Sequence, residues 1–141
     1  MKTVEFLEAV VPSDGVRFAA TPASFEKQGR TVNYYKHTPC PSVHELSLAC
    51  LSASKNQDQS FFALASYKAE SYVDPRDGKT KKRTQDNVKS LRSMWLDIDC
   101  GPNKPYEDQT AGLRALLAAV KKAELIAPTY IVNSGNGIHA Y

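Results

Sequence analysis

The stretch Met94-Trp95-Leu96-Asp97-Ile98-Asp99 constrains the fold more than any other part of this chain. Its residues alternate between aliphatic and other types, which predicts a β-strand because successive side chains of a strand point to opposite faces. The methionine, leucine and isoleucine would then enter a core, whereas Trp95, Asp97 and Asp99 would share the other face. Two ionised carboxylates about 6–7 Å apart on one strand face repel each other unless a positive charge lies between them. The stretch is therefore a candidate site for a divalent cation such as Mg²⁺; the alternative is a strand end at which Asp99 is a solvated turn residue.

Length and composition are those of an ordinary globular chain. Of the 141 residues, 42% are hydrophobic and 23% are charged, which suffices for one domain with a substantial core. The formal net charge of +3 permits a polyanionic partner without requiring one. Glu5 and Glu8 interrupt the apolar N-terminal run, so neither a signal peptide nor a membrane span is predicted. Three cysteines are few and odd in number, which favours the reducing cytoplasm.

Hydrophobic periodicity predicts a mixed α/β order of elements. A helix is expected over residues 3–11, and a strand–helix–strand unit is expected to join residues 94–99 to 129–133. If these two strands are parallel neighbours, their connection is right-handed and its helix covers one face of the sheet. The other expected elements are strands over 16–20 and 31–36 joined by a hairpin at 26–30, a helix from the Ser42 cap to residue 54, a strand over 61–65 buried on both faces, and a helix over 110–125.

A turn signal and a basic cluster lie together between residues 74 and 83. Asp74-Pro75-Arg76-Asp77-Gly78 is a strong turn sequence, and four cationic residues follow it closely. Lysine and arginine bind phosphates at nucleic-acid surfaces, although composition alone favours a solvated loop with a lysine tip. The candidate nucleic-acid contacts are Lys79, Lys81, Lys82, Arg83 and, further along the chain, Arg92.

Two histidines and two cysteines lie close together in the sequence, at His37, Cys40, His44 and Cys50. Their spacing matches no common zinc signature. Ser42-Val43-His44-Glu45 also has the pattern of a capping box that opens a helix, which explains part of the cluster without a metal. The sequence therefore leaves zinc binding open and favours an incidental grouping.

The sequence Asn-Ser-Gly-Asn-Gly-Ile-His-Ala-Tyr at residues 133–141 predicts a glycine-rich turn after the last full strand. Two glycines flanking Asn136 allow positive φ at several successive positions, so that consecutive N–H groups can converge on phosphate oxygens. Ser134 adds a hydroxyl donor, and His139 is placed to donate to the same anion. A tight hairpin turn explains Asn-Gly as well, and such a turn can also bind phosphate.

Four segments together resemble the archaeo-eukaryotic primase superfamily, above all the primase-polymerases of phages, plasmids and bacterial mobile elements. They are Trp-Leu-Asp-Ile-Asp-Cys, the amphipathic helix after it, Pro-Thr-Tyr-Ile-Val and Ser-Gly-Asn-Gly-Ile-His-Ala-Tyr. The resemblance is good over residues 92–141 and loose before them. In that family an Asp-hydrophobe-Asp motif binds the catalytic metals, and a Ser-Gly-x-Gly-hydrophobe-His motif contacts the triphosphate of the incoming nucleotide. By this resemblance Asp97, Asp99 and His139 are catalytic, Asp97 and Asp99 are metal ligands, and Ser134, Gly135, Asn136, Gly137 and His139 bind nucleotide.

The resemblance also implies a fold, an activity and partners. The fold would be a single primase-type catalytic domain, with residues 1–90 as an N-terminal α/β module and 91–141 as the first half of an RRM-like unit. The activity would be Mg²⁺- or Mn²⁺-dependent nucleotidyl transfer from an NTP or dNTP to a 3′-hydroxyl on a single-stranded DNA template, in a bacterial host cytoplasm. A fused or separate helicase would be a further partner, and no membrane is involved. The family's third motif, a carboxylate on a later strand, has no match before Tyr141, so we expect the N-terminal part of a catalytic domain, whose activity alone is not assured.

Three other functions are compatible with parts of this pattern. A non-catalytic fragment of the same fold would bind nucleic acid or nucleotide without chemistry. Sugar-nucleotide transferases also use Asp-x-Asp with a metal, but the Ser-Gly-Asn-Gly-x-His element argues against them. A rolling-circle nuclease would need a second histidine, which His139-Ala140-Tyr141 lacks.

Overall fold

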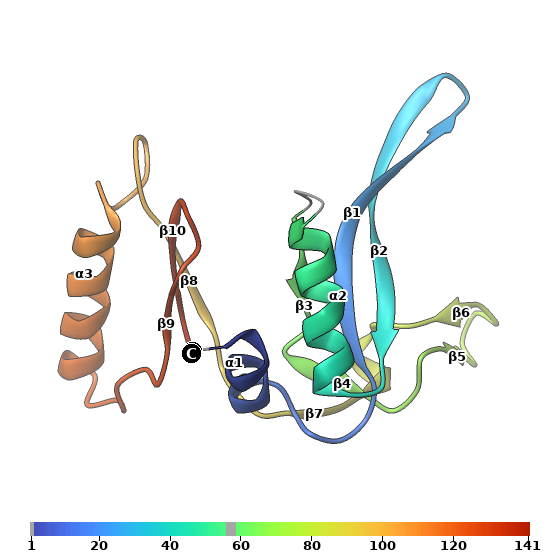
Figure 1. Cartoon of the computed structure of the whole chain (residues 1–141), viewed down its shortest axis with the longest axis horizontal. Helices are drawn as coiled ribbons and strands as arrows, with labels where there is room; N and C mark the ends of the chain where they lie inside the picture. The colour runs from blue at the N-terminus through green and yellow to red at the C-terminus, as the bar shows by residue number, and fades with distance from the viewer. Residues whose placement is uncertain (1, 56–58) are drawn as a thin grey trace. The chain divides into compact units, whose positions relative to one another are not determined.

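The computed structural model describes residues 2–55 and 59–141, which form two compact units, one ending at Arg92 and one comprising Ser93–Tyr141 (Figure 1). The described residues have a mixed α+β structure with three α-helices and several small antiparallel sheets, which confirms the mixed fold class. The resemblance to primase-polymerases implies a division into modules between residues 90 and 91. Among these described helices, none is long and apolar enough to cross a membrane.

The first unit contains two helices and most of the strands. Its elements are α1 (Thr3–Val10), β1 (Arg17–Lys27), β2 (Arg30–Cys40), α2 (Val43–Lys55), β3 (Phe61–Phe62), β4 (Ala65–Tyr67), β5 (Tyr72–Val73), β6 (Thr80–Lys81), a 3-10 turn η1 (Gln85–Asn87) and β7 (Val88–Leu91). The predicted helices are confirmed, and Ser42 caps α2 as expected, with the backbone N–H of Glu45 donating to Ser42 Oγ at 3.1 Å.

The β1–β2 hairpin is longer than its sequence suggests. Gln28 and Gly29 both have positive φ, at 51° and 72°, which is the geometry of a tight hairpin turn. β1 and β2 stay paired through residues 21–36, whereas β3 pairs with β1 only at Ala19 and Ala20. Beyond that point no strand within residues 2–55 and 59–141 pairs with this edge of β1, so Pro22 fits without breaking the sheet. Figure 1 shows the hairpin projecting past α2.

The core of the first unit lies at the base of this hairpin. Phe18, Ala63 and Tyr67 form a buried cluster in which the rings of Phe18 and Tyr67 meet edge to face, with centroids 5.2 Å apart. On the other face of the sheet, Phe62 is the partner of Ala19, and its ring contacts Phe6 of α1 at 6.1 Å. The hairpin is therefore packed on both faces at its base.

The prediction of a single buried strand over residues 61–65 is wrong. The chain leaves β1 after Phe62, and β4 pairs with β7 instead, so the apolar run supplies two separate sheets. Phe61 is 45% exposed. A continuous apolar run indicates burial but cannot indicate which partner each residue finds.

Arg17 holds together the segments around β1. Its side chain is buried and donates to the carbonyl oxygens of Pro12 at 2.9 Å, Gly15 at 2.9 Å and Pro41 at 2.5 Å. These carbonyls belong to the end of α1, the turn before β1 and the junction between β2 and α2. One guanidinium group thus satisfies acceptors from three segments.

The second unit is a three-stranded antiparallel sheet with one helix on it. Its elements are β8 (Leu96–Asp99), α3 (Gln109–Lys122), β9 (Ile131–Asn133) and β10 (Gly137–Ala140), with strand order β8-β10-β9. The packed face is formed by Leu116 of α3 with Ile138 and Ala140, and Ile98 joins them. Asp108 caps α3 by accepting from the N–H of Ala111 at 2.7 Å.

The strands 94–99 and 129–133 are not neighbours, contrary to the arrangement considered from sequence. β10 lies between β8 and β9 and is antiparallel to both. The reason lies in Gly137, since a Cβ there would come within 2.3 Å of the carbonyl oxygen of Ile98. Only glycine lets β10 approach β8 this closely, and the short turn after β9 returns the chain to that position.

Candidate functional site

The exposed face of the β8-β10-β9 sheet carries the residues that the sequence singled out. The strand register places His139 opposite Asp97 and Gly137 opposite Asp99. Since Ile98 and Ile138 pack on α3, their neighbours along each strand point to the other face. The acidic pair and the histidine, forty residues apart in sequence, therefore share one face on adjacent strands.

His139 and Asp97 are in direct contact there. His139 Nε2 lies 3.4 Å from Asp97 Oδ1, and the two side chains are 30% and 45% exposed. The His139 ring is flanked by Trp95, with centroids 6.0 Å apart, and by Tyr141, at 6.4 Å. Burial, and then the negative charge of Asp97, raises the pKa of Tyr141. Accessible polar groups thus lie beside aromatic rings of the kind on which a nucleobase can stack.

Asp99 has a cationic partner that the sequence analysis did not identify. Lys104 Nζ lies 2.7 Å from Asp99 Oδ2, and this contact raises the pKa of Lys104. The loop that carries Lys104 folds back on itself, with the N–H of Gly101 donating to the carbonyl of Tyr106 at 2.8 Å. Loop residues 101–105 and Glu107 line a surface hollow of about 460 Å³. An ammonium group therefore supplies the positive charge that the acidic pair requires.

The turn between β9 and β10 differs from the expected succession of left-handed residues. Within residues 134–137 only Gly135 has positive φ, at 96°, because Gly137 already belongs to β10. The N–H of Ser134 donates to the carbonyl of Gly137 at 3.0 Å, and the N–H of Gly135 donates to Asn133 Oδ1 at 2.8 Å. Two of the amides predicted to face a phosphate therefore bond within the turn.

Gln109, at the start of α3, fixes this turn in place. Its Nε2 donates to Asn133 Oδ1 and to the carbonyl of Gly135, both at 2.9 Å. No short sequence motif marks this role, because the contact joins a helix start to a turn 26 residues further along. The turn is thus positioned relative to both the sheet and α3.

The acidic pair suits a hard cation in its chemistry, although it is not a complete site by itself. Mg²⁺ is usually bound by one or two carboxylates together with substrate phosphates. Asp97 and Asp99 supply two such carboxylates on one accessible face. Nowhere in residues 2–55 and 59–141 do three His, Cys, Asp or Glu side chains gather as a metal site. Asp97 and Asp99 therefore fit a cation whose other ligands are the phosphates of a nucleotide.

The absence of a three-residue metal cluster from the described residues also applies to His37, Cys40, His44 and Cys50. Burial raises the pKa of the Cys40 thiol and of the Cys50 thiol, which disfavours the thiolate that zinc requires. Burial, and then the charges of nearby cations, lowers the pKa of His37. The structure gives no support for a zinc site in this cluster.

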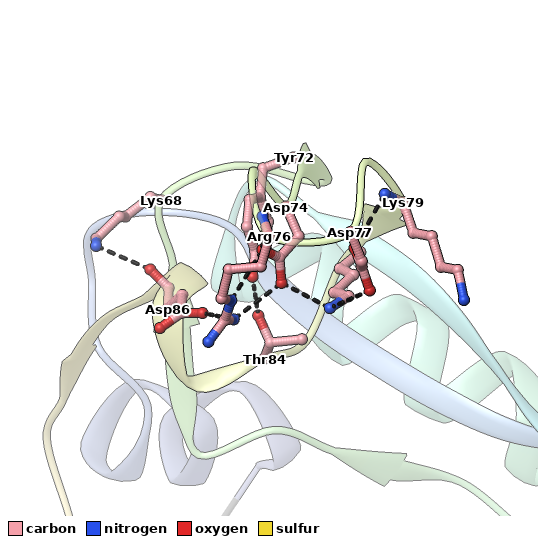
Figure 2. Close-up of polar contacts among 9 residues, drawn as sticks. Lys68, Tyr72, Asp74, Arg76, Asp77, Lys79, Thr84 and Asp86 are labelled. Carbon is pink, nitrogen blue, oxygen red and sulfur yellow. Dashed lines mark hydrogen bonds and ion pairs between the residues drawn. The ribbon is translucent and has the colours of Figure 1, made fainter.

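The predicted turn at residues 74–78 is organised around the buried carboxylate of Asp74 (Figure 2). Asp74 accepts from the backbone N–H of Arg76 at 2.9 Å, from Arg76 Nε at 3.0 Å and Nη2 at 2.8 Å, and from Lys81 Nζ at 2.6 Å. Arg76 also pairs with Asp86, and Lys81 pairs with Asp77 at 3.0 Å. We call this set, Asp74, Arg76, Asp77, Lys81 and Asp86, the Asp74 clamp.

The Asp74 clamp changes how the basic cluster is interpreted. Lys81 is held by two carboxylates, and Arg83 Nε contacts the hydroxyl of Tyr67 at 3.4 Å. Lys79, Lys82 and Arg92 are exposed. The run of cations is therefore partly neutralised by acids from its own loop, and its contact with nucleic acid stays a prediction.

Asp74→Asn is expected to loosen this loop and lower the midpoint of thermal unfolding by several degrees. Hydrogen bonds from Arg76, and then from Lys81, hold the pKa of Asp74 well below its usual 3.8. A lowered pKa in the folded state stabilises the protein fully above the unfolded value of 3.8, and this stabilisation is lost progressively as pH falls from that value to the folded one. The difference between wild type and variant should therefore be full above about pH 5 and shrink progressively below about pH 4.

Thermal unfolding followed by circular dichroism across this pH range measures the difference. Asp77→Asn is the matched control, because it removes only the exposed contact with Lys81. A difference for Asp74→Asn that vanished already near pH 5 would contradict the clamp, since a carboxyl whose pKa is lowered by folding is ionised in both states at that pH and keeps its full contribution.

Comparison of the chain with protein-family models, curated proteins and solved structures finds no match in any of the three.

Proposed function

We propose that this chain binds a nucleoside triphosphate with Mg²⁺ or Mn²⁺ on the exposed face of the β8-β10-β9 sheet, as part of a primase-polymerase. The fold we propose for the second unit is the first half of an RRM-like catalytic unit, with residues 1–92 as an N-terminal module. The observation that supports the proposal most is the pairing of His139 with Asp97 on adjacent strands, with Asp99 on the same face. The motif resemblance described above supplies the reaction, nucleotidyl transfer to a 3′-hydroxyl.

Each residue of this face has a defined task in the proposal. Asp97 and Asp99 would hold the cation, which would take the place of the Lys104 ammonium beside Asp99. His139, whose Nε2 already faces Asp97, donates to a phosphate oxygen beside them. When bound, the metal ions activate the attacking hydroxyl and stabilise the leaving pyrophosphate.

The turn and the aromatic residues complete the proposed site. Gln109 keeps the Ser134–Gly137 turn beside the sheet edge, so that the Ser134 hydroxyl is available to the triphosphate. Trp95, which is 49% exposed, offers a surface for the nucleobase. The template would be single-stranded DNA, and a helicase would act with the chain.

Asp97→Asn and His139→Ala are each expected to weaken Mn²⁺-dependent dNTP binding about ten-fold or more, since even outer-shell partners change metal affinity by about 10–100-fold. Titration of a fluorescent dNTP with the full chain, with Mn²⁺ and with EDTA, measures this effect. Asp97→Asn should abolish most of the metal dependence, whereas His139→Ala should weaken binding while metal dependence persists.

Glu70→Gln removes an exposed carboxylate of the first unit and is the matched control. Unchanged dNTP affinity in both site variants, with wild-type circular dichroism, would refute the proposal. Binding that did not respond to EDTA would refute its metal requirement.

A second candidate, a nucleic-acid-binding module without chemistry, is favoured by one observation. Lys104 already neutralises Asp99, so one of the two carboxylates has a positive partner without a metal. This function predicts salt-dependent DNA binding that Asp97→Asn leaves unchanged. The dNTP titration separates the two functions, because the module would show no metal-dependent dNTP affinity.

A further inference from the structure

The projecting part of the β1–β2 hairpin, residues 21–36, has two chemically different faces. We call this part the arm. In its register Phe25 pairs with Val32 and Ala23 pairs with Tyr34, so odd-numbered residues of β1 share a face with even-numbered residues of β2. The rings of Phe25 and Tyr34 meet on this face with centroids 5.7 Å apart. They are 49% and 45% exposed.

All the cations of the arm lie on that same face. Lys27 pairs with Arg30 at the tip, and Lys36 lies opposite Thr21 nearer the base. Each of these three cationic residues is exposed. Within residues 21–36, all of them described, the single carboxylate is Glu26, which lies on the opposite face and accepts from Thr31 Oγ1 at 2.6 Å. Every charged side chain on the face with the two rings is therefore a cation.

We infer that this face of the arm binds a single strand of nucleic acid. Cations flanking exposed rings form the combination that holds a strand without sequence preference, since phosphates contact the cations while bases stack on the rings. Lysine is depleted at protein–protein interfaces, so three cations beside two rings favour a polyanion over a protein partner. Stacking requires unpaired bases, which favours a single strand over a duplex. The face spans about 20 Å from its tip to Lys36, enough for more than one nucleotide.

This inference deepens the proposed function, and its link to a template rests on that function. The binding itself does not, because the arm belongs to the first unit and contains no residue of the Asp97 face. The two can therefore be tested apart. Binding of the strand is measured in EDTA, whereas dNTP binding requires the metal.

Tyr34→Ser and Tyr35→Ser are the decisive pair of variants, since these neighbours point to opposite faces of the arm. Fluorescence anisotropy of a labelled oligothymidylate with the full chain in EDTA measures the affinity. Tyr34→Ser is expected to weaken binding about five-fold or more, from the loss of one stacked base. Tyr35→Ser, on the face where Tyr35 meets Phe61 at 5.4 Å, should change it less than about two-fold.

Charge is tested by a triple variant, Lys27→Gln with Arg30→Gln and Lys36→Gln. The slope of log affinity against log salt should fall by about 2, from about 0.7 per phosphate contact on a single strand. Lys2→Gln with Lys121→Gln and Lys122→Gln is the control, because it removes the same charge from exposed positions outside the arm. Circular dichroism of every variant checks that the fold is kept.

Several results would overturn the inference. One is an equal loss of oligothymidylate affinity for Tyr34→Ser and Tyr35→Ser, and another is an equal slope of log affinity against log salt for the two triple variants. Tighter binding of a duplex of the same length would also overturn it. So would arm variants that change self-association in sedimentation and leave DNA binding unchanged. If arm variants lose DNA but keep Mn²⁺-dependent dNTP binding, the inference stands independently of the Asp97 face. If dNTP binding fails in wild type while the arm still binds DNA, only the proposed function fails.

Discussion

Gly137→Ala is expected to destabilise the second unit by about 3 kcal/mol or more, near the upper end of overpacking effects. A Cβ at residue 137 would lie 2.3 Å from the carbonyl oxygen of Ile98, 3.1 Å from its carbonyl carbon and 3.2 Å from Asp99 Cα. All three atoms belong to the backbone of β8, so no side-chain rotation can relieve the contact. The strand pair that aligns His139 with Asp97 would have to separate.

Urea unfolding followed by tryptophan fluorescence measures this effect, because the single tryptophan, Trp95, adjoins β8 in the same unit. Gly135→Ala is the control. Its φ of 96° makes alanine strained, but a Cβ there meets nothing within 4 Å, so a cost of about 1 kcal/mol is expected. If Gly137→Ala unfolded no earlier than Gly135→Ala, the close approach of β10 to β8 would be wrong.

Arg17→Met should be the most damaging substitution in the first unit, with an expected cost of about 3–5 kcal/mol. Methionine keeps the length of the side chain but leaves the carbonyls of Pro12, Gly15 and Pro41 without their donor. The buried carbonyl of Pro12 would lose its charged donor at the full cost of its lost hydration, and the part-buried bonds to Gly15 and Pro41 would be lost with it. The three segments that Arg17 joins should then separate from one another.

Native-state hydrogen exchange of a peptide that covers residues 63–67 reports this loss, because Ala63 N–H and Tyr67 N–H donate to the carbonyls of Phe18 and Val16 at the base of the hairpin. Arg17→Lys keeps the charge but cannot serve three acceptors with a planar fork, so it should fall between wild type and Arg17→Met. Arg30→Met at the exposed hairpin tip should change stability by less than about 0.5 kcal/mol. Equal protection in wild type and Arg17→Met would contradict the role assigned to Arg17.

Local patterns predicted the helices, the hairpin turn and the residues of the candidate site. The aliphatic stripe of α3, the Ser42 cap and the Gln28-Gly29 turn are determined within a few residues of sequence. The alternation in residues 94–99 likewise sorted Asp97 and Asp99 onto one face, but of the three aliphatic residues expected in a core only Ile98 packs there, whereas Leu96 is 50% and Met94 91% exposed. Each of these signals depends on spacing along one strand or one helix, which is visible in the sequence.

Contacts that form only when the chain folds back on itself were not predictable in this way. The position of β10 between β8 and β9 depends on space that Gly137 leaves beside Ile98, and glycine in a turn-like sequence suggested a left-handed residue instead. The sequence predicts a solvated loop at Asp74, because the cations of Arg76 and Lys81 reach its buried carboxylate only after the loop closes. Lys104 and Arg17 belong to the same class, since their partners are set by tertiary structure.

The register of β8 and β10 couples the candidate site to the hydrophobic core beneath it. A slip of one residue would turn His139 toward α3 and expose Ile138, which is 3% exposed in the observed pairing. One strand register therefore sets both the burial that stabilises the sheet and the alignment of the His139 imidazole with the Asp97 carboxylate. An engineer who wished to change the separation of these two groups would have to substitute their side chains, because sliding the strands would dismantle the domain that displays them.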